Sequence, residues 1–154
     1  MIVIRVLHID DEATIRLLAR VNLEWQGEME VIEAADGRTG VRLAKHELPD
    51  MILLNVNLPG LDGWQVAEEL HKDQETREIP VVFLTARSDL KDLARGLELG
   101  AVDYITKPFN PLELAPRIRA LLERLERGER DELRQERISE LRALMGADSA
   151  DSPA

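Results

Sequence analysis

The sequence predicts an α/β fold, a doubly wound, five-stranded parallel sheet with helices on both of its faces. Short aliphatic segments alternate five times with longer amphipathic segments, which is typical of successive strand–helix units. Most of the short segments have no polar face, as expected for parallel strands that are covered on both sides. The chain of 154 residues is long enough for five such units around a hydrophobic core.

Five short segments have the length and the aliphatic composition of buried strands. The first is apolar except for Arg5 and His8, and we expect His8 to be a packed core residue rather than a ligand. The second is closed by the turn signal Asp36-Gly37, and the fourth follows Pro80. The predicted strands cover residues 2–9, 29–34, 51–54, 81–84 and 101–105.

Apolar residues at helical spacing fill the intervals between these strands. The fourth helix is expected to begin at a cap formed by Ser88 or Asp89 and to end at Gly100. Trp25 and Trp64 are expected to be packing residues. The predicted helices cover residues 13–25, 38–47, 64–72 and 88–99.

The last of the five helices is predicted to begin near Asn110. Asn110 is a suitable cap, Pro111 suits the first turn, and Glu113 follows three residues after the cap. Pro116 then lies about one and a half turns into the helix. Because proline has no N–H to bond to the carbonyl of Leu112, we expect a kink at this point.

A highly charged segment follows the five units and is predicted to be helical. Residues 128–146 form a helical extension of the domain at 1–127, and residues 147–154 are expected to be disordered. The extension could be a dimerising helix, a partner-binding helix or a solvated tail. It is too short for a DNA-binding or catalytic module, so we expect a domain that stands alone. Its large apolar residues are Leu133, Ile138, Leu141, Leu144 and Met145.

Composition excludes several classes of function. The formal net charge is -10, from 30 acidic and 20 basic residues, and such a field repels nucleic-acid phosphates and anionic membranes. No apolar run reaches the roughly 20 residues of a membrane span, and no signal-peptide pattern is found. The absence of cysteine excludes disulfides, thiolate metal sites and cysteine nucleophiles. The cytoplasm is the expected compartment.

Polar residues stand at the ends of four predicted strands, and ligands of doubly wound sheets bind at the carboxyl ends of strands. Carboxylate and amide oxygens suit Mg²⁺, whereas a hydroxyl and an ammonium suit the oxygens of a phosphoryl group. The sequence therefore predicts a site for Mg²⁺ and a phosphoryl group at this edge of the sheet. The residues concerned are Asp10, Asp11, Asn55, Asn57, Thr85 and Lys107.

These residues belong to five separated motifs that together resemble the receiver domain of bacterial response regulators in two-component signalling. The resemblance covers about residues 1–127 and implies the flavodoxin-like (βα)5 fold. Five motifs that agree in order and spacing are specific, although any one alone would be weak. The motifs are Asp10-Asp11, the run 49–54 before Asn55, the loop 58–63, Thr85-Ala86, and Lys107-Pro108-Phe109.

The resemblance implies a role for each residue of the metal site. Asp11 would ligate Mg²⁺ directly, and Asp10 would do so partly through water. Residue 55 would be both a metal ligand and the phosphate acceptor, and Asn57 would offer its backbone carbonyl.

The resemblance also implies a phosphoryl-binding and switching group. Thr85, with the neighbouring Ala86, and Lys107 would contact the phosphoryl oxygens. Tyr104 matches the aromatic residue whose inward swing follows Thr85. The bond before Pro108 is expected to be cis.

Receivers are protein-interaction switches that catalyse little themselves, so the resemblance implies a partner protein rather than enzyme activity. The expected partner is a sensor histidine kinase or another signalling protein. Docking, or homodimerisation, would use the fourth helix, fifth strand and fifth helix, and the C-terminal helix is a second candidate for a dimer contact.

Asn55 departs from the receiver pattern, because the acceptor must be a carboxylate. An amide is a weak nucleophile and carries no charge, so we expect no aspartyl phosphorylation, weak Mg²⁺ binding and no ion pair to Lys107. The chain could be a phosphate-independent receiver, could carry a deliberate inactivating exchange, or could deamidate, which the bulky Val56 disfavours. Two alternative functions stay open. One is a phosphate-independent adaptor, and the other is a Mg²⁺-dependent phosphohydrolase, which would need the missing aspartate.

Overall fold

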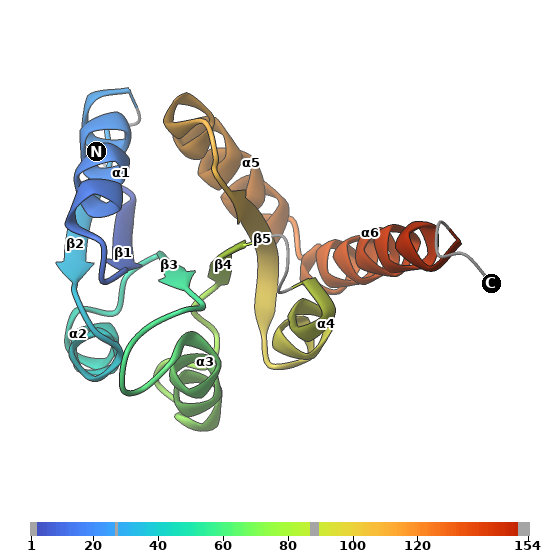
Figure 1. Ribbon diagram of the computed structural model, residues 1–154. Coiled ribbons are helices and arrows are strands. Elements are labelled where there is room, and N and C mark those ends of the chain that lie inside the picture. The colour runs from blue at the N-terminus through green and yellow to red at the C-terminus, as the bar shows by residue number, and fades with distance from the viewer. Residues whose placement is uncertain (1–2, 27, 87–89, 151–154) are drawn as a thin grey trace.

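The computed structural model describes residues 3–26, 28–86 and 90–150, and it contains the predicted sheet (Figure 1). All strands are parallel, in the order β2-β1-β3-β4-β5. The strands are β1 (Arg5–Ile9), β2 (Glu30–Ala34), β3 (Met51–Asn55), β4 (Val81–Ala86) and β5 (Ala101–Lys107). The helices are α1 (Ala13–Trp25), α2 (Gly37–Glu47), α3 (Gly63–Lys72), α4 (Leu90–Glu98), α5 (Leu114–Glu126) and α6 (Arg130–Ala150), and the 3₁₀ turn η2 (Pro111–Glu113) precedes α5. The predicted fold class is confirmed.

The two faces of the sheet build two apolar cores, which explains why the strands lack a polar face. Successive strand residues point to opposite faces, so each strand contributes to both cores. One core lies under α2, α3 and α4 and includes Leu7, Ile9, Ile52, Leu54 and Phe83. The other lies under α1 and α5 and includes Val6, Met51, Leu53, Val82 and Leu84.

Three strands run further than predicted, and the extra residues are polar apart from Ala86. Asn55 pairs with Leu84, Thr85 pairs with Thr106, and Ala86 pairs with Lys107. Ladder hydrogen bonds use backbone groups only, so a change from aliphatic to polar side chains does not end a strand. The candidate site residues Asn55, Thr85 and Lys107 therefore lie on the sheet itself.

The predicted kink at Pro116 was wrong. The turn η2 occupies residues 111–113, so α5 begins only at Leu114 and Pro116 falls in its first turn. Backbone N–H groups of a first turn have no intrahelical acceptor, so the missing N–H of proline costs little there. The Asn110 carboxamide caps the turn by accepting from the N–H of Leu112, 3.0 Å away.

Of two other predicted helix ends, that of α4 agrees with the structure and that of α6 does not. Gly100 follows α4 with φ 102°, as predicted for a glycine that ends a helix. The proposed caps Ser88 and Asp89 lie outside the described residues. The boundary at residue 146 was too early, because α6 continues to Ala150. An internal glycine such as Gly146 weakens a helix by only about 1 kcal/mol, which does not force it to end.

The remaining predictions concern single side chains. His8 is fully buried, as expected, and Trp64 packs on Phe83 with ring centroids 4.8 Å apart. Trp25, by contrast, is 86% exposed, so its predicted packing role was wrong. Among the described residues, no helix is long and apolar enough to cross a membrane.

Candidate functional site

Residues at the carboxyl ends of β1, β3 and β5 form a polar cluster, which we call the strand-end pocket. It consists of Asp10, Asp11, Asn55, Asn57 and Lys107, and hydrogen bonds or ion pairs join all five. Asp10 follows β1, and its N–H donates to the carbonyl of Ala34. Parallel pairing of β1 with β3 brings Asp10 and Asn55 to the same edge of the sheet.

The side-chain amide of Asn55 lies at the centre of this pocket. Its Nδ2 atom donates to Asp10 Oδ1 at 3.3 Å, to Asp11 Oδ1 at 3.3 Å and to the Asn57 carbonyl at 3.1 Å. The opposite amide orientation would set its oxygen against two carboxylates, so electrostatics favours this one. The NH₂ group thus faces the three oxygens that were predicted to face Mg²⁺.

Asp10 is fully buried, yet it is held in its charged form. Burial alone raises the pKa of a carboxyl, but His8, the Glu12 N–H and the Lys107 ammonium together hold the pKa of Asp10 below its ordinary value. The Glu12 N–H donates to Asp10 Oδ1 at 2.9 Å. His8 Nε2 lies 3.6 Å from Asp10 Oδ2.

Lys107 reaches the pocket from the end of β5. Its Nζ atom lies 3.4 Å from Asp10 Oδ2 and 3.7 Å from Glu12 Oε1. Glu12 was not among the predicted site residues, although its place directly after Asp10 and Asp11 was a signal. One ammonium here faces three carboxylates whose oxygens lie within 4.8 Å of one another.

The pocket has a suitable donor set for Mg²⁺, which prefers carboxylate, carbonyl and amide oxygens. Asp10, Asp11 and the Asn57 carbonyl would hold the ion. Asn55 could contribute its Oδ1 atom only after its amide has turned over, because its NH₂ group now faces those oxygens.

Thr85 and Ala86 lie beside the pocket on β4. Thr85 is buried, and its Oγ1 atom donates to the Ala86 carbonyl at 3.1 Å. Pairing with β5 places Ala86 next to Lys107, and the Lys107–Pro108 bond is cis, as predicted. The phosphoryl contacts expected of Thr85 and Ala86 stay predictions.

Tyr104 is buried in the core beneath α4, where it lies beside α6, a contact that the sequence did not predict. It shares its core with Leu141 of α6. Burial raises the pKa of the Tyr104 hydroxyl, and the Glu140 carboxylate, through its charge and a hydrogen bond, raises it further. The structure therefore places this predicted switch residue against α6.

The loop after β3 returns to the pocket because Gly63 has no side chain. The Gly63 N–H donates to the Val56 carbonyl at 2.9 Å. A Cβ atom on Gly63 would lie 2.5 Å from the Asn55 carbonyl oxygen, closer than real contacts allow. The loop can pack this tightly behind Asn55 only with glycine at this position.

Fold and pocket together define a receiver-type signalling domain. A sequence model of the response regulator receiver domain matches residues 6–119, so this chain belongs to that family. Proteins of this family act in two-component signal transduction, and their receiver domains bind Mg²⁺.

Several relatives of similar sequence are transcriptional regulators. The chain is 46% identical over 121 residues to the phosphate regulon transcriptional regulatory protein PhoB of Escherichia coli, which covers 79% of this chain and 52% of PhoB. It is 44% identical over 123 residues to the DNA-binding dual master transcriptional regulator RpaA of Synechocystis, covering 80% and 51%. The chain thus spans about half the length of the curated relatives it matches.

Solved receiver structures have the same fold over nearly their whole length. A CheY-like receiver protein of Methanospirillum hungatei superimposes with a TM-score of 0.75 at 28% identity, covering 82% of this chain and 99% of that one. A putative response regulator of Chloroflexus aurantiacus gives 0.73 at 32% identity, covering 80% and 100%. About a fifth of this chain has no counterpart there.

Proposed function

We propose that this chain is a protein-interaction switch of two-component signalling in which residue 55 does not accept a phosphoryl group. The observation that carries this is the Asn55 amide, whose NH₂ group faces the oxygens of Asp10, Asp11 and Asn57. A phosphoryl acceptor needs a free carboxylate oxygen, and an amide has none.

The NH₂ group also takes over part of the role of a cation. Its two hydrogens carry partial positive charge and are shared among acceptors that Mg²⁺ would otherwise bind. Bound Mg²⁺ would neutralise the carboxylates and the oxygens of an incoming phosphoryl group. Turning the Asn55 amide breaks its three hydrogen bonds, so we expect Mg²⁺ binding to be weak.

The chain's own residues otherwise resemble a complete receiver site. Lys107 lies 3.4 Å from Asp10, where an ammonium can bind an anionic partner's oxygens, and Thr85 lies one residue past the pairing partner of Asn55. We propose a histidine kinase or another signalling protein as its partner and no enzyme activity of its own. The alternative of a Mg²⁺-dependent phosphohydrolase has weaker support, because Asn55 stands where its nucleophile would be.

Intact mass after incubation with acetyl phosphate and Mg²⁺ tests the proposal. We expect no phosphoryl adduct on the native chain and an adduct on Asn55→Asp. The matched control is Asn110→Asp, the same exchange at an exposed helix cap where aspartate caps equally well. We expect no adduct there.

Each outcome of this experiment has a meaning. An adduct on the native chain would overturn the argument from Asn55. No adduct on Asn55→Asp would show that the rest of the pocket cannot support phosphoryl transfer. Continuous release of phosphate by the native chain would favour the phosphohydrolase.

A further inference from the structure

Helix α6 packs on its own domain instead of extending into solvent along its whole length. In Figure 1 it leaves α5 and lies beside α4 and β5, and contacts join it to both. Leu133 is fully buried in the core under α1 and α5, and Leu141 is fully buried in the core under α4. The helix therefore crosses the outer side of β5 from one core to the other.

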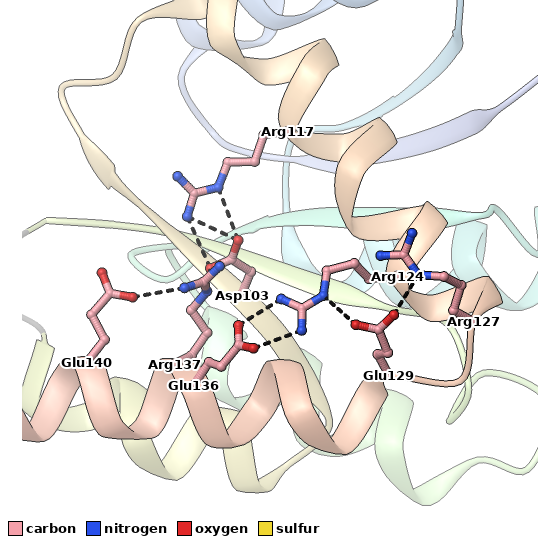
Figure 2. Close-up of polar contacts among 8 residues, drawn as sticks. All are labelled: Asp103, Arg117, Arg124, Arg127, Glu129, Glu136, Arg137 and Glu140. Atoms are coloured by element: carbon pink, nitrogen blue, oxygen red, sulfur yellow. Dashed lines mark hydrogen bonds and ion pairs between the residues drawn. The ribbon is translucent and has the colours of Figure 1, made fainter.

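The centre of this contact is the β5-edge cluster, which consists of Asp103, Arg117, Arg137 and Glu140 (Figure 2). Asp103 is fully buried, and Arg117 of α5 donates two hydrogen bonds to it, at 3.0 and 3.1 Å. Arg137 of α6 forms an ion pair with the same carboxylate at 2.8 Å. One buried carboxylate thus joins three elements, of which α6 is one.

A bulge in β5 lets Asp103 reach this place. Val81 pairs with Ala101, but Val82 pairs with Asp103, so one extra residue interrupts the ladder and re-aims the following side chain. Asp103 Oδ1 also accepts from the Tyr104 N–H at 2.7 Å, and Arg117 donates to the Tyr104 carbonyl at 3.0 Å.

Ion pairs also hold the turn between α5 and α6. Arg124 of α5 pairs with Glu129 at 3.0 Å and with Glu136 at 2.7 Å, and Arg127 pairs with Glu129 at 2.6 Å (Figure 2). These partly exposed pairs contribute little stability each. They do fix the direction in which the chain leaves Gly128, whose φ of 77° forms the corner.

We infer that α6 regulates its own domain by covering the α4–β5–α5 face, the docking face expected from the receiver resemblance, so that this face is closed to a partner while α6 is docked. The α4–β5–α5 face accepts a helix with an apolar stripe like that of Leu133, Ile138 and Leu141 and with an arginine placed to reach Asp103. A second helix of this chemistry can bind only after α6 has left. The inference rests on α6 and the β5 edge, and not on the chemistry of Asn55.

A labelled peptide in solution tests this. The probe is a fluorescein-labelled peptide of residues 129–150, and its anisotropy is measured against the full chain and two variants. The releasing variant is Ile138→Asp with Leu141→Asp, which places charges in the apolar stripe. The matched control is Ser139→Asp with Ala143→Asp, which adds the same charges to the exposed side of α6.

We expect the peptide to bind the releasing variant at least roughly 100-fold more tightly than the native chain or the control. A short tether keeps α6 at a millimolar effective concentration, against which a free peptide must compete. Equal binding to the native chain and the releasing variant would overturn the inference, and so would no binding to the releasing variant.

A second arm tests the role of Asp103. We expect the peptide with Arg137→Glu to bind the releasing variant at least tenfold more weakly, and the peptide with Arg134→Glu, whose arginine pairs with Asp131, to bind nearly as well as the native one. Equal loss from both exchanges would refute recognition through Asp103. Circular dichroism checks that the releasing variant is folded, and the single exchange Leu141→Ala replaces it if it is not, with the same order of affinities.

Discussion

Two fully buried aspartates, Asp10 and Asp103, differ in how much positive charge surrounds their carboxylates. Asp103 in the β5-edge cluster meets two guanidinium groups. Asp10 in the strand-end pocket shares one ammonium with Glu12 and lies beside Asp11, and it also accepts from the neutral N–H groups of Glu12 and Asn55. The charge of Asp103 is neutralised by the protein alone. The strand-end pocket has too little positive charge, because one ammonium serves several carboxylates.

Pairing of this kind distinguishes a structural charge from a ligand site. A buried carboxylate costs free energy unless it is paired, so a fully paired one stabilises packing and needs nothing more. A pocket that gathers carboxylates around too few cations is held together only if something else supplies charge. In this chain the Asn55 amide supplies part of it.

The largest effect is expected at Asp103. Replacing Asp103 by Asn leaves Arg117 without its counter-charge and Arg137 with Glu140 alone, and it should lower the free energy of unfolding by about 3 kcal/mol. This is the low end for a buried pair, because Arg117 is 42% and Arg137 23% exposed. Urea denaturation measures it. A loss well below 1 kcal/mol would show that the cluster is not satisfied in the way we describe.

A smaller effect of opposite electrostatic origin is expected at Asn55. Asn55→Asp adds a carboxylate to a pocket already short of positive charge, so the metal-free protein should lose about 1 kcal/mol of stability. Mg²⁺ should restore it. Unfolding in EDTA and in Mg²⁺ measures both. Equal or higher stability of the variant in EDTA would contradict the claim that the metal-free pocket is short of positive charge.

Acid should affect the strand-end pocket through Asp10. Its pKa is lowered in the folded state, so its ionised form stabilises the fold above its ordinary pKa, and this contribution is lost as the pH falls below about 4. Native protein should therefore lose stability in this window more steeply than Asp10→Asn does. Thermal unfolding between pH 5 and pH 3 is the measurement, and parallel curves would exclude Asp10 as a source.

The smallest effect is expected at Asp131, which serves as the matched control for Asp103. It pairs with Arg134 at 3.0 Å, but its side chain is 81% exposed. Asp131→Asn should change the free energy of unfolding by no more than about 0.5 kcal/mol. A loss as large as that of Asp103→Asn would show that burial does not separate the two aspartates.

Local pattern was enough to predict the sheet and most of the pocket. Aliphatic runs located all five strands, and polar residues at their ends located Asp10, Asn55 and Lys107. The orientation of the Asn55 amide could not be predicted, because its acceptors come from two segments, Asp10-Asp11 after β1 and Asn57 after β3. Pro116 was misplaced because a capping signal does not show whether a 3₁₀ turn precedes the helix.

The docking of α6 was also beyond the sequence. Its apolar residues are few, and Arg137 and Asp103 lie far apart in the chain. Asp103 was a signal in itself, since a charge inside an otherwise apolar strand needs a partner.

The β5-edge cluster has one more consequence, for the behaviour of many copies in a crowded solution. An edge strand offers unpaired backbone groups to any other strand. At Tyr104 these groups are already bonded to Asp103 and Arg117, and α6 crosses the same edge. At the opposite edge, Glu30 and Glu33 of β2 carry charge. Both edges thus resist strand addition, and losing α6 would promote aggregation even where the domain stays folded.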